Sequence, residues 1–115
     1  MTGNLISNSP STPFAYGAFV LLTLSTPREK YWGVVLRLES TGITLRGIPL
    51  EALDDFTSQV RSGDPVGIAT LFFPMHRVER LELDQRDGEV PALFEQFEAK
   101  TGSTVINLFG VGAHR

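Results

Sequence analysis

The stretch from Trp32 to Leu38 constrains most strongly what this chain can fold into. Apolar side chains stand at each of its even-numbered positions, and a glycine, Gly33, lies inside it. Because successive side chains of a β-strand point to opposite faces, this pattern predicts a half-buried strand with its even-numbered face in the core. A glycine within a strand typically marks a bulge, a bend or a close backbone approach. We therefore expect a strongly bent strand.

Further strands are predicted on both sides of this one. Residues 39–42 form a short turn, after which Ile43 and Leu45 alternate with polar residues, so the two segments predict a β-hairpin. Upstream, the run from Ala18 to Leu24 is apolar except for Thr23 and ends in turn-forming residues. This run predicts the first full strand.

The apolar spacing becomes helical between residues 50 and 62. Leu53, Phe56 and Val60 lie three or four residues apart, and Gly-Asp-Pro follows the segment, which predicts a short amphipathic helix. Acidic residues in the first turns of a helix are expected from the helix dipole alone. We therefore assign no acid–base pair or metal site to the three found there, which are Glu51, Asp54 and Asp55.

The second half of the chain predicts two more strands, over Gly67 to Phe73 and Val78 to Asp84. Val78 is out of phase with the residues that follow it, which predicts a bulge near Glu79 or Arg80. These strands are separated by Pro74, which interrupts the pattern.

A C-terminal extension over residues 90–109 completes the chain. Its first part has the apolar spacing of a second short helix, which ends before Gly102. A last strand is predicted from Thr104 to Phe109.

The order of these elements sets the fold class. Strands and helices do not alternate regularly, as they would in a parallel α/β sheet. We expect a mainly β protein with two short helices, of the α+β class, built as a small, strongly bent antiparallel barrel or roll.

Length, charge and cysteine content narrow the function classes. The chain has 115 residues, which suits one domain, placed at residues 14–115 after a polar leader of residues 1–13. It contains no cysteine, which removes disulfides, thiolate metal sites and cysteine nucleophiles, and we expect no cofactor. A formal charge of -3 disfavours non-specific binding to nucleic acid, so we expect no DNA partner.

The N-terminal region carries no targeting signal that we recognise. The leader lacks the basic start and apolar run of a signal peptide. The stretch from Phe14 to Thr26 is nearly uncharged, but a membrane span needs about 20 apolar residues. We therefore expect a cytoplasmic, bacterial protein without a membrane partner.

The predicted hairpin carries a family resemblance. The segment Tyr31-Trp-Gly-Val-Val-Leu-Arg-Leu-Glu-Ser-Thr-Gly-Ile-Thr-Leu-Arg46 resembles the first motif of Sm-like proteins, in which a glycine bends the second strand and a short loop leads to the third. Gly33 matches that glycine, and Glu39 matches an acidic position of the family. Ile43 and Leu45 match apolar residues of its third strand. The resemblance implies an Sm-like small β-barrel, and rings closed through strand edges are common in that family.

The stretch from Leu71 to Leu83 has the shape of the second Sm-like motif, two strands joined by a tight turn. Hfq-like bacterial members carry a lysine-histidine pair there that helps to bind RNA. His76 stands at a similar place, but Met75 replaces the lysine. The hairpin loop Glu39-Ser-Thr-Gly42 also lacks the asparagine that the family presents to a base.

Four polar residues are candidates for contact with a ligand or with RNA: Arg46, His76, Arg77 and Arg80. The three arginines would bind phosphate if the fold brings them together. A metal at His76 would require distant carboxylates such as Glu79 or Asp84, because no histidine pair has metal-binding spacing. We therefore assign no metal or catalytic residue.

Three apolar residues are candidates for a subunit interface: Phe72, Phe73 and Met75. The two phenylalanines point to opposite faces of one strand, whereas a small barrel has a single interior. One of them should therefore be covered by a helix or by a partner subunit.

These observations predict a non-catalytic Sm-like binding or scaffold module that acts as a homo-oligomer through its strand edges. One alternative is an RNA-binding Sm-like protein, which the acidic balance disfavours. The other is a small-molecule binder or enzyme that uses a pocket near His76.

Overall fold

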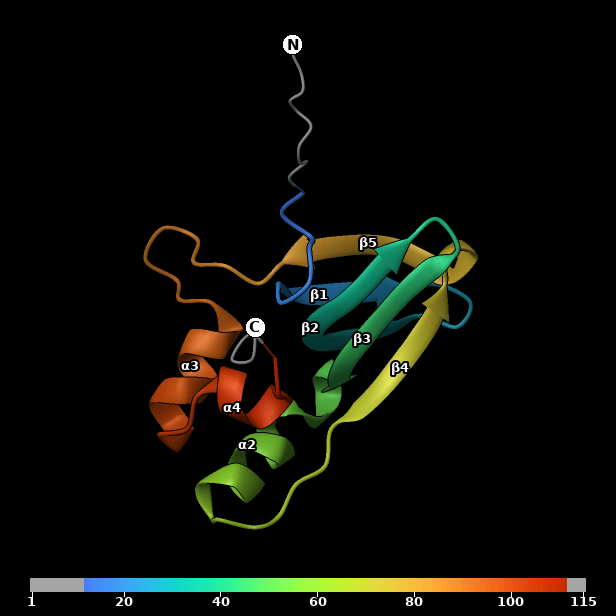
Figure 1. Ribbon diagram of the computed structural model, residues 1–115. Coiled ribbons are helices and arrows are strands. Elements are labelled where there is room, and N and C mark those ends of the chain that lie inside the picture. The colour runs from blue at the N-terminus through green and yellow to red at the C-terminus, as the bar shows by residue number, and fades with distance from the viewer. Residues whose placement is uncertain (1–11, 112–115) are drawn as a thin grey trace.

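The computed structural model describes residues 12–111, so the structure of most of the predicted leader lies outside the described residues. In this part of the chain, five antiparallel strands form one sheet in the order β4-β3-β2-β1-β5 (Figure 1). The strands are β1 (Phe19–Leu24), β2 (Glu29–Glu39), β3 (Gly42–Pro49), β4 (Ala69–Pro74) and β5 (Val78–Leu83).

Helices follow β3 and β5, and a single turn links β4 to β5. The helical elements are η1 (Leu50–Ala52), α2 (Leu53–Arg61), η2 (Met75–Arg77), α3 (Leu93–Thr101) and α4 (Val105–Phe109). Figure 1 shows α2, α3 and α4 gathered on one side of the sheet. Within residues 12–111, no helix is long and apolar enough to cross a membrane.

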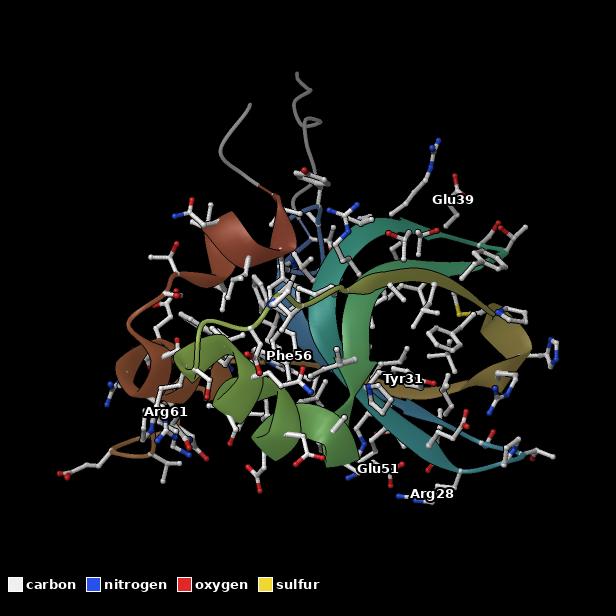
Figure 2. All side chains as sticks on the ribbon, turned by 90° about the horizontal axis from the view of Figure 1, so that it is seen from below. Arg28, Tyr31, Glu39, Glu51, Phe56 and Arg61 are labelled. Atoms are coloured by element: carbon white, nitrogen blue, oxygen red, sulfur yellow. The ribbon has the colours of Figure 1, made fainter. Side chains whose placement is uncertain are left out.

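The predicted α+β class is confirmed, but the sheet does not close into a barrel. The strands curl around an interior (Figure 2), yet β4 and β5 remain the two edges of an open sheet. The helix predicted over residues 50–62 is found as η1 and α2. The β2–β3 hairpin also forms as predicted, with Glu39 opposite Gly42.

Apolar side chains are buried on both faces of the sheet. The helix-side core lies between the sheet and the helices and contains Trp32, Val34, Ile48, Phe56, Phe97, Val105, Phe109 and Val111. The inner core lies on the concave face and contains Val20, Leu22, Leu24, Val35, Ile43, Leu45 and Phe73. This division corrects the expectation of a half-buried β2, because Trp32 and Val35 are both buried but belong to different cores.

A bulge in β2 explains why one predicted core residue is exposed. Val35 lies opposite Leu45, but the next pair is Arg37 with Thr44, so Leu36 is an extra residue. An extra residue shifts the alternation by one position. Leu38 therefore shares a face with Ile43 at the end of the sheet, where it is 40% exposed.

A second bulge lies where the sequence predicts it. Leu24 pairs with Val78 and Thr23 pairs with Arg80, which leaves Glu79 without a partner in the ladder. The extra residue corrects the phase between Val78 and the rest of β5, so that Val78 and Leu81 both pack on the inner core.

The last predicted strand is wrong, because residues Val105–Phe109 form the helix α4. The hydroxyl of Thr104 accepts a hydrogen bond from the Asn107 N–H (3.3 Å), which caps the helix start. Gly110 ends the helix with φ of 70°, a conformation that favours glycine. Val105 and Phe109, four residues apart, both enter the helix-side core. A short apolar run fits either period, and here the capping residues decide for the helix.

One buried carboxylate joins the sheet to the helices. Asp84, which directly follows β5, is 7% exposed. Its Oδ2 accepts hydrogen bonds from the Trp32 indole Nε1–H (3.0 Å) and the Phe94 N–H (2.9 Å), and its Oδ1 accepts one from the Leu93 N–H (2.7 Å). The carboxylate thereby satisfies backbone donors in the first turn of α3 and fixes that turn against β2.

Arg77 fastens η2 to the β1–β2 turn. Its Nε donates to the Ser25 carbonyl (3.1 Å), and its Nη2 donates to the Pro27 carbonyl (2.7 Å) and to Glu29 Oε1 (3.2 Å). The Ser25 N–H donates in return to the Arg77 carbonyl (2.9 Å). These contacts close one end of the curled sheet.

Replacement of Asp84 by asparagine should lower the free energy of unfolding by about 2–3 kcal/mol, because the amide group faces a buried N–H with another donor. Urea denaturation followed by circular dichroism measures the change. Asp87→Asn, at an exposed turn position, is the matched control and should stay within about 0.5 kcal/mol of wild type. Equal effects of the two substitutions would show that the Asp84 contacts are energetically unimportant.

Gly33→Ala should destabilise the chain by about 3 kcal/mol or more, because a Cβ would stand 2.3 Å from the Arg46 carbonyl oxygen and 2.6 Å from Gly47 Cα. The same denaturation experiment applies. Gly67→Ala is the control, since a Cβ there meets nothing within 4 Å. A Gly33→Ala variant as stable as the Gly67→Ala variant would contradict the close strand approach.

Arg77→Met should cost about 1–2 kcal/mol, because it removes the donors that hold the turn. Arg28→Met removes only the exposed ion pair with Glu79 and should cost less than about 1 kcal/mol. Thermal unfolding of both variants gives the comparison. If the Arg28→Met variant proved the less stable of the two, Arg77 would not be the fastening residue.

Candidate functional site

The two edge strands present the first candidate site. Each of them has one side that is not paired within the described sheet. The sequence of β4, Ala-Thr-Leu-Phe-Phe-Pro, contains no charged residue. An uncharged edge strand is a ready template for pairing with another strand, and proteins usually protect such edges with charges.

The outward backbone groups of β4 follow from the hydrogen-bond pattern. The Met75 N–H donates to the Thr41 carbonyl (2.9 Å), beside the pair of Gly42 and Pro74. Hydrogen-bonded and non-hydrogen-bonded pairs alternate along an antiparallel ladder. The N–H and C=O groups that face away from β3 are therefore those of Thr70 and Phe72.

The other edge has a different character. Directly after β5, the Asp84 N–H donates to the Phe19 carbonyl (2.8 Å), and by the same alternation the outward backbone groups of β5 belong to Leu81 and Leu83. Glu82 and Arg80 form an exposed ion pair along this strand (3.6 Å). The two edges thus differ in charge, although both offer backbone groups that are unpaired within the described sheet.

The paired phenylalanines of β4 separate as the sequence predicts. Phe73 is 8% exposed and lies in the inner core with its ring 5.0 Å from that of Tyr31. Phe72 is 54% exposed, and its ring lies over Gly42, where a Cβ would stand only 2.6 Å from the ring. Met75 is also exposed. Phe73 is therefore a core residue, whereas Phe72 and Met75 are the surface members of the predicted interface set.

The predicted arginines do not converge. The Arg46 Nη1 donates to the carbonyl of Phe109 at the end of α4 (2.8 Å), and its Nε donates to Thr70 Oγ1 (3.3 Å). Arg77 is held by the β1–β2 turn, and Arg80 pairs with Glu82. Strands β3 and β5, which carry two of these arginines, are separated by β2 and β1. The three do not form a phosphate-binding cluster.

His76 lies on η2 and is exposed. Among residues 12–111 it has no hydrogen-bond or ion-pair partner. The carboxylates considered as its metal partners have other roles, since Glu79 pairs with Arg28 (3.3 Å) and Asp84 caps α3. No group of three metal-binding side chains occurs in the described part of the chain.

A hollow of about 560 Å³ is the second candidate site. It is lined by residues 28–31 at the start of β2 and residues 49–51 at the end of β3, and we call it the β2–β3 hollow. Figure 2 shows Arg28, Tyr31 and Glu51 near one another at this end of the curled sheet. A smaller hollow of about 130 Å³ lies between α2 and α3. His76 lines neither of them.

Sequence reasoning missed the β2–β3 hollow and the structural role of Asp84. Tyr31 lies opposite Pro49 in the ladder, so the lining depends on a register that residue types alone do not specify. Asp84 does stand nine residues before α3, but a capping residue so far from its helix has no local sequence signature.

Comparison of the chain with protein-family models, with curated proteins and with solved structures found no match to any of them. The comparisons therefore assign the chain to no family.

Proposed function

We propose that the chain is a non-catalytic, Sm-like binding or scaffold module that assembles into a closed homo-oligomer by pairing β4 of one subunit with β5 of the next. The observation that carries the proposal is the uncharged β4 edge, whose outward backbone groups at Thr70 and Phe72 have no partner within residues 12–111. A bacterial, cytoplasmic setting is part of the proposal.

The difference between the edges favours a head-to-tail contact. Self-pairing of β5 would bring its charged residues together, whereas pairing with β4 meets no like charge, because β4 has none. Head-to-tail contacts use two different surfaces of each subunit and generate rings when the rotation closes. Every subunit then has both edges covered.

The energy of one such contact is moderate. Backbone hydrogen bonds contribute about 1 kcal/mol each, and burial of the exposed Phe72 ring contributes roughly 2 kcal/mol more. These gains oppose an association cost of roughly 4–15 kcal/mol. Ring closure makes the last contact intramolecular, so a closed ring is far more stable than a single pair.

The RNA-binding alternative has little support from the described side chains. The guanidinium groups of Arg46 and Arg77 donate to backbone carbonyls, and Arg80 has an acidic neighbour. Phosphate binding needs several cations directed at one backbone. We therefore do not include RNA in the proposed function.

Size-exclusion chromatography with light scattering should give one oligomeric mass that is unchanged between about 5 and 100 μM, a range above a micromolar dissociation constant. Phe72→Glu places a charge on the β4 edge and should shift the mass to that of the monomer. Ile106→Glu on α4 is the matched control, because Ile106 is similarly exposed, and should keep the wild-type mass. A monomeric wild type, or an oligomeric Phe72→Glu variant, would contradict the proposal.

A further inference from the structure

The β2–β3 hollow has the properties of a small ligand site. Its volume of about 560 Å³ falls within the range of ligand pockets, and it lies at an open end of the curled sheet, a common position for such sites (Figure 2). None of its lining residues belongs to β4 or β5, so it is separate from the edges used in the proposed assembly.

The wall of the hollow combines an apolar surface with a free hydroxyl. Pro49 and Leu50 supply aliphatic area, and Tyr31 supplies a half-buried ring that is fixed by its packing on Phe73 (5.0 Å). Within residues 12–111 the Tyr31 hydroxyl has no hydrogen-bond partner. An apolar wall with a few polar groups is typical of sites that orient a small molecule.

The charged residues of the hollow fall into two kinds. Arg28 is paired with Glu79 (3.3 Å) and Glu29 with Arg77 (3.2 Å), so both already have partners. Lys30 and Glu51 have no ion pair in the described part of the chain. The hollow therefore offers one cation and one anion, unpaired within residues 12–111, beside an apolar wall.

We propose that the β2–β3 hollow binds a short zwitterionic peptide with apolar side chains. Its carboxylate pairs with the Lys30 ammonium group, its ammonium group pairs with the Glu51 carboxylate, and its side chains pack on Tyr31 and Leu50. A purely anionic ligand is repelled by Glu51 and a purely cationic one by Lys30, whereas a zwitterion satisfies both. The inference does not depend on the oligomeric state.

Two-dimensional 1H–15N NMR with the dipeptide Leu-Leu as the probe tests this site. Saturable shifts are expected at the amides of residues 28–31, 50 and 51, with a dissociation constant in the millimolar range or below, about 1 mM. The blocked dipeptide N-acetyl-Leu-Leu-amide has the same side chains without the charges and should bind at least about fivefold more weakly.

Single substitutions separate the two charge contacts. Lys30→Met and Glu51→Gln should each weaken Leu-Leu binding by about three- to tenfold, since each removes one charge-assisted contact. Lys100→Met and Asp55→Asn make the same kinds of change outside the hollow and should leave the affinity unchanged. Because all four side chains are exposed, the variants should fold.

Three results would overturn the proposal: no saturable shift up to about 20 mM Leu-Leu, which lies above the weakest affinity considered; equal binding of the blocked dipeptide; or unchanged affinity in both the Lys30→Met and the Glu51→Gln variants. The oligomer mass measured above is independent of all three, so failure of this site and failure of the proposed assembly are distinguishable.

Discussion

The buried carboxylate of Asp84 is the contact on which the arrangement of the molecule depends. It binds a side chain of β2 and two backbone donors of α3, and so fixes the helices over one face of the sheet. Taking a carboxylate out of water is costly unless hydrogen bonds replace its hydration, and three donors do so here. Trp32, held by this contact, then packs edge-on against Phe109 of α4, with ring centroids 5.4 Å apart.

The covered helix-side face leaves limited surfaces for function. The opposite face bends around the inner core, and Gly33 permits the close strand approach that this bend needs. Arg77 closes one end of the curl by binding the β1–β2 turn. In the described part of the chain, the two edges and the β2–β3 hollow remain for partners and ligands, which is why both proposals are placed there. The assembly uses backbone groups of an uncharged edge, whereas the peptide site uses two charges beside an apolar wall.

The elements that the sequence predicts well are those whose signals are local. The strand around Gly33, the hairpin turn and the phase shift at Val78 all depend on neighbouring residues, and the structure confirms each of them. The prediction for Val105–Phe109 failed because its residues suit either a helix or a strand, and that for Leu38 failed because the bulge at Leu36 reverses its face.

The candidate arginines show the same limit. That Arg46 reaches the end of α4 and Arg77 the β1–β2 turn is a consequence of tertiary packing, so the sequence identified cations but not their partners.

The central claim is that the outward side of β4 is paired in solution, and hydrogen–deuterium exchange at single amides tests it most directly. Thr70 and Phe72 have outward N–H groups, whereas Leu71 and Phe73 face β3, so the strand contains its own reference. The account predicts that the amides of Thr70 and Phe72 are protected to about the same degree as those of Leu71 and Phe73. Exchange of Thr70 and Phe72 at the rate of unstructured peptide, with Leu71 and Phe73 still protected, would mean that the edge is open to solvent and would contradict the assembly.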